Sequence, residues 1–191
     1  MLTKKDRLVY GTYKLPSNYD DFLSIVGNLF SSGVEWIDTA PMYNKGLSEK
    51  WIGKITKKFP FKVATKGGKF YSGNKLKVSL NYSFLSNSFE NSLNILSTDK
   101  LDAFFVHNYD NSTTKEELAS TLEKLRSNYS VNKLGVSNFP PKLWQFLAKE
   151  RLIEIIQFEN NDICDNSKQV IDSKKFNLEC WTYRLFRKGK R

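Results

Sequence analysis

The sequence predicts an α/β fold, an incomplete (β/α)8 barrel with about seven strand–helix units. Short apolar runs alternate with amphipathic helical patterns along the 191 residues. Runs that are apolar at nearly every position are typical of parallel strands buried on both faces. Polar side chains follow strand after strand, as on the rim of a barrel, whereas a doubly wound sheet concentrates its chemistry at one switch point. These observations favour a TIM-type barrel over a doubly wound sheet.

The predicted strands are short, and most end in a polar residue. They cover residues 7–11, 34–39, 61–66, 101–107, 132–138, 153–159 and 177–183. The polar residues at the ends of the second to seventh strands are Asp38, Lys66, His107, Ser137 with Asn138, Gln157 and Tyr183. Because parallel strands of a barrel end on one rim, we expect these side chains to lie near one another.

Helix signals fill the intervals between these strands. Asp20 and Asp21 open the first helical pattern and Gly33 closes it, as expected for acidic N-termini and glycine C-caps. Thr113 and Glu116 have the spacing of a capping box before a later helix. Further helices are predicted around residues 51–55 and 85–96, after the two prolines at 140–141, and, more weakly, near residues 170–171.

Bulk composition limits the class of protein. With 40% hydrophobic residues the chain can bury one substantial core, and we expect a single domain over residues 1–191. No stretch of about 18 uncharged apolar residues predicts a membrane span, and the N-terminus lacks a signal-peptide core, so a cytoplasmic protein is expected. The two cysteines and single histidine form no metal-site pattern, and we expect no metal.

The net charge of +10 is the unusual bulk property. It admits nucleic acid, an acidic surface or a phosphorylated ligand as partner. The lysines are spread along the chain and no RNA- or DNA-binding motif accompanies them, which favours a solvated basic surface and no nucleic-acid partner.

Four polar residues near the predicted rim form a chemically coherent set: Asp38, Tyr43, Lys66 and His107. A tyrosine hydroxyl has a pKa of about 10 and is by itself a poor proton donor near neutrality. A neighbouring ammonium favours the phenolate and lowers that pKa, and a carboxylate beside the lysine keeps the lysine charged. An imidazole can donate a hydrogen bond to the same oxygen. Such a set suits proton transfer coupled to hydride transfer.

The stretch "GVEWIDTAPMYNKGLSEKWIG" resembles the signature of the aldo-keto reductases, in which a strand ending in Asp-Thr-Ala precedes the catalytic tyrosine and a Gly-x-Ser-Glu turn. The resemblance extends over nearly the whole chain, and the order and approximate spacing of the motifs match. The other matching segments are "GTYKL", "VATKGG", "LDAFFVHNYD", "KLGVSNF" and "IIQFENN".

This resemblance implies an oxidoreductase that reduces an aldehyde or ketone with NADPH, or alternatively NADH. It makes Tyr43 the general acid, tuned by Lys66 and Asp38, with His107 orienting the substrate carbonyl. The resemblance assigns the cofactor to Gly11, Thr12, Asp38, Ser137, Asn138, Gln157 and Tyr183.

The resemblance also implies that the chain stops before an eighth strand and the loops that hold the cofactor phosphates. Strands one and seven would then have unpaired edges, which favours self-association. Two hypotheses remain open: an active carbonyl reductase acting on a small molecule, or a catalytically impaired fragment or non-catalytic binding or regulatory relative that keeps the fold.

Overall fold

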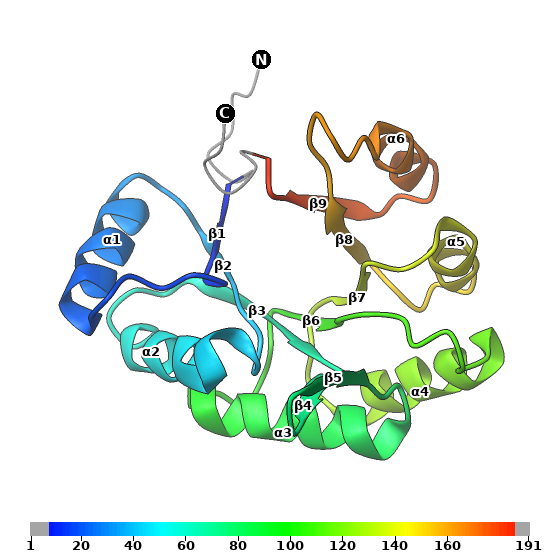
Figure 1. Ribbon diagram of the computed structural model, residues 1–191, viewed down its shortest axis with the longest axis horizontal. Coiled ribbons are helices and arrows are strands. Elements are labelled where there is room, and N and C mark those ends of the chain that lie inside the picture. The colour runs from blue at the N-terminus through cyan, green and yellow to red at the C-terminus, as the bar shows by residue number, and fades with distance from the viewer. Residues whose placement is uncertain (1–7, 186–191) are drawn as a thin grey trace.

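A computed structural model describes residues 8–185 and contains a seven-stranded parallel sheet curled into most of a barrel (Figure 1). The strand order is β1-β2-β3-β6-β7-β8-β9, which is also the order along the chain. The strands are β1 (Val9–Gly11), β2 (Trp36–Asp38), β3 (Lys62–Gly67), β6 (Ala103–Val106), β7 (Leu134–Ser137), β8 (Ile155–Glu159) and β9 (Glu179–Tyr183). The predicted incomplete (β/α)8 barrel is therefore confirmed.

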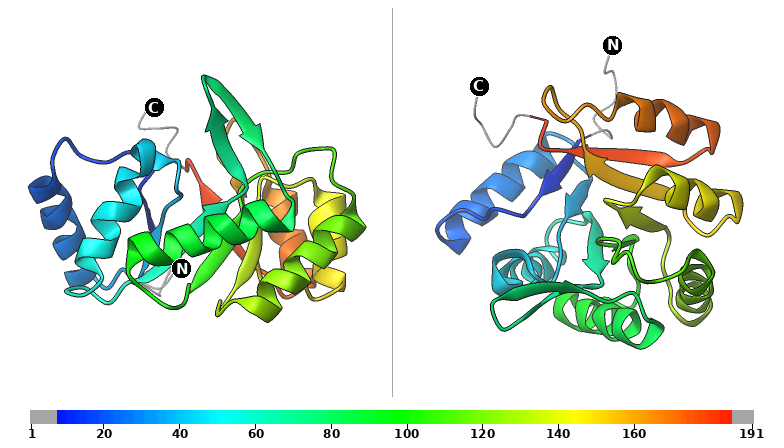
Figure 2. Two further views of the ribbon diagram at one scale, coloured as in Figure 1. Left: turned by 90° about the horizontal axis from the view of Figure 1, so that it is seen from below. Right: turned by 45° about the vertical axis from the view of Figure 1, so that its right-hand side comes forward.

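Helices cover the outer face of the curled sheet and alternate with its strands (Figures 1 and 2). They are α1 (Tyr19–Ser31), α2 (Leu47–Ile55), α3 (Tyr82–Leu96), α4 (Lys115–Asn128), α5 (Pro141–Lys149) and α6 (Ser167–Lys175). A short 3-10 turn, η2 (Tyr43–Gly46), leads into α2.

The helix ends follow local rules, with one correction to the sequence prediction. Gly33 has φ +80° just after α1, the conformation that a glycine after a helix adopts at least cost. The capping box of α4 is formed by Thr114 and Glu117, not by Thr113 and Glu116. Thr113 instead donates to Asp110, through both its backbone N–H and its hydroxyl, and so belongs to the preceding turn.

A two-stranded antiparallel hairpin, β4 (Lys69–Ser72) and β5 (Lys75–Val78), follows β3 and was not expected from the sequence. In the left view of Figure 2 this green hairpin extends beyond the rest of the barrel. Gly68, at φ +90°, makes the sharp turn from β3 into β4. The hairpin is therefore joined to the rim almost directly.

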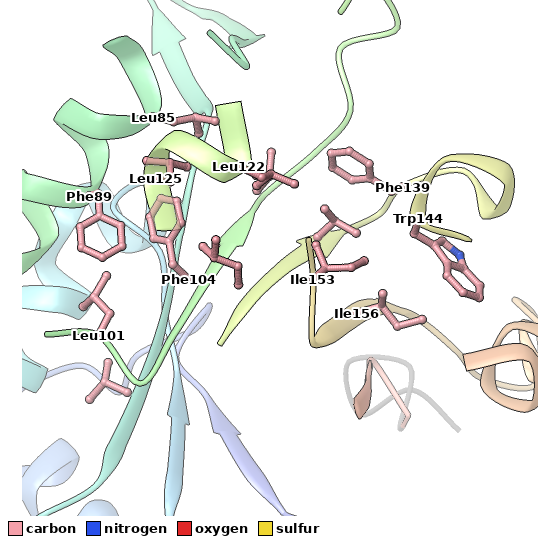
Figure 3. Packing of buried hydrophobic residues seen from close by; sticks show 14 of the residues in the cluster. Leu85, Phe89, Leu101, Phe104, Leu122, Leu125, Phe139, Trp144, Ile153 and Ile156 are labelled. Atoms are coloured by element: carbon pink, nitrogen blue, oxygen red, sulfur yellow. The ribbon is translucent and has the colours of Figure 1, made fainter. Parts of the chain in front are cut away.

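The larger core lies between the sheet and its helices. The ring centroids of Phe104 on β6 and Phe89 on α3 are 4.9 Å apart, and Figure 3 shows Leu122 and Leu125 of α4 on the same side of the sheet. Every one of these four side chains is fully buried. Burying a side chain of this size contributes about 1.5–3 kcal/mol, so this layer supplies most of the hydrophobic stabilisation.

A second, smaller core fills the inside of the barrel. Trp36 and Trp181 pack edge to face with centroids 5.1 Å apart, and Phe105 lies 5.7 Å from Trp181. Large aromatic side chains thus occupy the space that the curled sheet encloses.

Within residues 8–185, β1 pairs only with β2 and β9 pairs only with β8. A groove of about 1350 Å³ is lined by both of these edge strands and reaches Asp38, Gln157 and Tyr183. The barrel is consequently open on one side, and its polar rim communicates with that opening.

Candidate active site

The strand register brings the predicted site residues to one rim. Asp38 lies opposite Gly11 on one side and Ala64 on the other, and Ser137 lies opposite Gln157. Lys66 is the fifth residue of β3, and His107 directly follows β6. Residues far apart in sequence are therefore gathered at the carboxyl ends of the parallel strands, as expected.

A buried ion pair lies at the base of the site. The Lys66 Nζ is 2.5 Å from Asp38 Oδ1 and donates a second hydrogen bond to the Thr39 carbonyl over 2.9 Å. Lys66 is only 1% exposed. Burial lowers the pKa of Lys66, and the neighbouring Asp38 carboxylate opposes that shift. The carboxylate thus favours the charged ammonium in a place where water cannot solvate it.

Tyr43 lies over this ion pair. The Lys66 Nζ is 5.0 Å from the centre of the Tyr43 ring, which is also in edge contact with the His107 ring at a centroid distance of 5.9 Å. Burial raises the pKa of Tyr43, and the negative charge of Asp38 raises it further. The sequence argument predicted a lowered pKa and is wrong in direction, because desolvation of the phenolate dominates. Tyr43 is therefore a neutral hydroxyl, the protonation state that a proton donor needs.

His107 is almost completely buried beside Tyr43. Burial lowers the pKa of His107 to about 2, and the positive charges of Lys66 and Lys69 act in the same direction. The imidazole is consequently neutral at physiological pH and retains one N–H donor.

A chain of hydrogen bonds joins the ion pair to the predicted cofactor residues. Gln157 Nε2 donates to Asp38 Oδ1 over 3.2 Å, and Ser137 Oγ donates to Gln157 Oε1 over 3.1 Å. Asn138 Nδ2 donates to Ser137 Oγ over 3.1 Å, and the Tyr183 hydroxyl donates to Asn138 Oδ1 over 2.5 Å. Four strands, β2, β7, β8 and β9, thus contribute to one polar network.

Asn138 does not cap the helix that follows it. Its φ is +60°, in the left-handed region, and the N-cap of α5 is Pro140. Its amide instead donates to Ser137 and, over 3.4 Å, to the carbonyl oxygen of His107. Asparagine tolerates the left-handed conformation, and here that conformation directs the amide toward the rim.

The two cofactor residues predicted at the end of the first strand, Gly11 and Thr12, have different surroundings. Thr12 is fully buried, and both its backbone N–H and its hydroxyl donate to the Asp38 carbonyl, over 2.9 and 3.0 Å. A Cβ added at Gly11 would meet no atom within 4 Å, so the space beside this glycine is open. Thr12 therefore supports the Asp38 backbone, whereas Gly11 leaves room for a ligand.

Comparison with known proteins identifies the family of the chain. The model of the aldo/keto reductase family matches residues 7–189. The chain belongs to the aldo/keto reductase family.

Curated relatives in this family match part of the chain. A probable aldo-keto reductase 1 of Glycine max is 29% identical over 135 residues, which are 69% of this chain and 39% of that protein. The aldo-keto reductase YhdN of Bacillus subtilis is 35% identical over 111 residues, 56% of this chain and 34% of that protein. The chain thus aligns with little more than a third of the length of these aldo-keto reductases.

Among solved structures, a glycerol dehydrogenase from Gluconobacter oxydans superposes with a TM-score of 0.84 at 26% identity. The match covers 96% of this chain and 61% of that one. An aldo-keto reductase from Bacillus halodurans, in a holo form, has a TM-score of 0.80 at 21% identity and covers 92% of this chain and 61% of that one. The fold is therefore that of the aldo/keto reductases over nearly all of the chain.

Two residues that support the candidate site, Asn44 and Ser48, were given no role in the sequence analysis. Asn44, at φ +49°, donates through Nδ2 to the carbonyl oxygens of Thr12 and Tyr13, over 3.1 and 3.2 Å. Ser48 donates to the same Thr12 carbonyl over 3.0 Å. These bonds fasten the loop that carries Tyr43 to the end of β1. An asparagine beside a Lys-Gly turn was the available signal, because asparagine tolerates the left-handed conformation.

Glu49 was named in the sequence only as part of the family motif, and its environment is unusual. It is fully buried on α2, where Oε1 accepts hydrogen bonds from Thr65 over 2.6 Å and from Ser92 over 2.8 Å. Oε2 has no hydrogen-bond partner among the described residues. Burial raises the pKa of Glu49. Glu49 thereby joins α2 to β3 and α3, directly behind the strand that carries Lys66.

Neither a membrane span nor a metal site is found in the part of the chain that the structure describes. No helix there is long and apolar enough to cross a bilayer. No group of three or more histidine, cysteine, aspartate or glutamate side chains there is arranged to hold a metal ion.

Proposed function

We propose that this chain carries the carbonyl-reducing site of an NAD(P)H-dependent oxidoreductase, with NADPH as the expected cofactor and a small aldehyde or ketone as substrate. The observation that carries the proposal is the placement of a neutral Tyr43 over the buried Lys66–Asp38 ion pair with His107 at its edge. Family membership supports an oxidoreductase, and the relatives whose names specify an activity are reductases or a dehydrogenase.

Tyr43 would act as the proton donor. Its raised pKa keeps the phenol protonated at neutral pH and also makes it a weaker acid, so proton transfer would depend on stabilisation of the phenolate that forms. As that proton leaves, negative charge develops on the tyrosine oxygen, and the nearby Lys66 ammonium favours the phenolate. Asp38 would keep Lys66 charged and in place.

His107 would orient the substrate. A neutral imidazole with one N–H can donate a hydrogen bond to a carbonyl oxygen without competing as an acid. The edge contact between the His107 and Tyr43 rings supports a shared role, because it makes the two side chains neighbours. The substrate oxygen would then accept two hydrogen bonds, which also polarises the carbonyl.

The polar network fits the carboxamide of a nicotinamide. A carboxamide has one acceptor oxygen and two N–H donors, and Ser137, Asn138 and Gln157 offer a hydroxyl and two amides. The open space beside Gly11 is compatible with a ligand lying against the rim, and we propose that the Tyr183 ring stacks on the nicotinamide. When bound, the reduced nicotinamide supplies the hydride.

The test is NADPH oxidation by the purified chain with a panel of aldehydes and ketones. We expect aldehyde-dependent loss of the NADPH absorbance in the wild type and at least about a hundredfold lower turnover in Tyr43→Phe, because general acid catalysis contributes about 10²–10⁴-fold. Tyr13→Phe, a neighbouring tyrosine in edge contact with Tyr43, is the matched control and should change turnover little.

A non-catalytic relative is the second candidate, favoured by the opening of the barrel. The groove between β1 and β9 reaches Asp38 and Gln157, so water can approach groups that a reductase would keep dry. This candidate expects NADPH oxidation to stay at background for every carbonyl, with Tyr43→Phe indistinguishable from wild type. Measurable turnover that depends on Tyr43 would exclude it.

A further inference from the structure

We propose that Lys69 is a substrate-recognition residue and that the site takes carbonyl compounds bearing an anionic group, a carboxylate or a phosphate. This inference deepens the proposed function and rests on it, since it concerns the ligand of the same site. It is carried by the position of Lys69 on the rim and by the balance of charge around it.

Its position in the chain and one hydrogen bond hold Lys69 at the rim. It is the first residue of β4, directly after the Gly67–Gly68 turn, and its Nζ donates to Asn108 Oδ1 over 3.0 Å. Asn108 follows His107 in the chain. The positive charge of Lys69 also acts on His107, whose pKa it helps to lower. The ammonium is therefore a neighbour of the imidazole that would orient the substrate carbonyl.

The hairpin itself is fastened on its other face. Side chains alternate between the two faces of a strand, so Phe70 points away from the face that carries Lys69 and Tyr71. The ring of Phe70 packs on Phe84 of α3 with centroids 4.6 Å apart. This contact fixes the base of the hairpin, and Lys69 is accordingly held in place rather than carried on a free loop.

Within residues 8–185, two other cations near the site are paired with carboxylates, whereas Lys69 is not. Lys66 is paired with Asp38, and Arg184 is paired with Glu159 over 2.7 Å. Tyr43 and His107 are neutral. Among the described residues, Lys69 has no carboxylate within ion-pair distance, and its one hydrogen-bond acceptor is a neutral amide.

Partial burial makes this unpaired charge significant. Lys69 is half-buried, and burial lowers the pKa of its ammonium because water solvates it less completely. An anion placed beside it would replace the missing solvation, and charge-assisted hydrogen bonds are stronger than neutral ones. The nearest carboxylate in the loop after His107, Asp110, already accepts from Ser112 and Thr113. The rim thus offers a cation to an incoming ligand.

The experiment uses the single histidine as a reporter. The chain contains one histidine, so an untagged protein labelled at histidine gives an NMR signal from His107 alone. Three ligands with the same aldehyde are titrated without cofactor: 4-formylbenzoate, its neutral methyl ester, and 4-formylphenyl phosphate. We expect the anions to shift the His107 signal at about five- to tenfold lower concentration than the ester, and added salt to reduce that difference. The two anions distinguish carboxylate from phosphate recognition.

Variants show whether the anions bind at Lys69 itself or are attracted by the overall positive charge of the protein. Lys69→Met should remove the anion preference, and Lys69→Arg should keep most of it. Lys77→Met is the matched control, because Lys77 is an exposed lysine of the same hairpin, paired with Phe70 and so on the opposite face. It should keep the full preference. Circular dichroism confirms that each variant is folded.

Any one of three results would overturn the proposal. The wild-type titrations could have equal midpoints for the anions and the ester, the His107 signal could fail to respond to either anion, or Lys69→Met could keep the anion preference. The result does not depend on turnover. If NADPH is not oxidised but the anion preference is intact, the proposed reaction is wrong and anion recognition stands. If NADPH is oxidised but there is no anion preference, only anion recognition is wrong.

Discussion

Gln157 on β8 donates a hydrogen bond to Asp38 on β2 across the barrel, over 3.2 Å and 119 residues of sequence. The same Asp38 oxygen accepts from Lys66. One carboxylate oxygen therefore connects the residues that would transfer the proton with those that would hold the nicotinamide. Any change at Asp38 should affect both parts of the site.

Asp38→Leu should strongly destabilise the protein. It leaves the buried Lys66 ammonium without its counter-charge, and breaking a buried ion pair in this way costs about 3–5 kcal/mol. Urea unfolding measures the loss. The double variant Asp38→Leu with Lys66→Met should recover a large part of it, because no unpaired charge then remains. The exposed pair Lys62–Glu35 is the control, and Glu35→Gln should cost no more than about 1 kcal/mol.

Glu49 should make the protein less stable as pH rises. Its pKa is raised in the folded state by burial, so between the unfolded and folded pKa values the folded state binds more protons. Stability from this group is present below the unfolded pKa of about 4.3 and is lost as pH rises through the folded pKa. Glu49→Gln should flatten this decline in urea unfolding measured at increasing pH. The exposed Glu123→Gln should leave the wild-type profile unchanged, and superimposable profiles for wild type and Glu49→Gln would refute the role of Glu49.

His107 should not titrate in the folded protein across the physiological range. Its folded pKa is lowered to about 2, whereas an unfolded histidine titrates near 6.5. The unfolded state therefore binds the extra proton first, and stability is lost as pH falls below about 6.5. The His107 NMR signal should stay constant between about pH 8 and pH 5 in buffer and move with a midpoint near 6.5 in urea. A midpoint near 6.5 in the folded protein would contradict burial of a neutral imidazole.

The open edges should promote self-association. β1 and β9 each have one unpaired side among the described residues, and such edges readily pair with another chain. Sedimentation velocity should show a sedimentation coefficient that rises with protein concentration. Thr182→Lys places a charge on β9 beside the groove and should reduce the association, whereas Tyr71→Lys on the hairpin should not. A concentration-independent monomer in the wild type would remove this expectation.

Much of the fold could be predicted because its signals are local. Apolar runs and helix caps can be recognised from a few neighbouring residues. In a parallel barrel, the residue that ends each apolar run lies on the rim. Asp38, Lys66 and His107 were located in this way. The capping box of α4 was misplaced by one residue because Thr113 and Thr114 offer the same spacing to Glu116 and Glu117, and only the turn around Asp110 selects between them.

The hairpin β4–β5 was not predicted because each of its strands is only four residues long and β4, KFYS, does not alternate polar and apolar residues. Its position depends on the packing of Phe70 against α3, a contact that local sequence does not specify. Lys69 was consequently given no role from the sequence, although it lies three residues after Lys66.

The sequence by itself predicted the order of the barrel strands and helices, the rim positions and the four candidate catalytic side chains, because these follow from local periodicity and from motif order. Only the tertiary structure decided how they interact. The Gln157–Asp38 bond requires the strand order and register of the closed part of the barrel. The raised pKa of Tyr43 and the unpaired charge of Lys69 depend on the balance between burial and nearby charges. That balance is set in three dimensions, because desolvation and Coulomb energy depend on distance in space and not on separation along the chain.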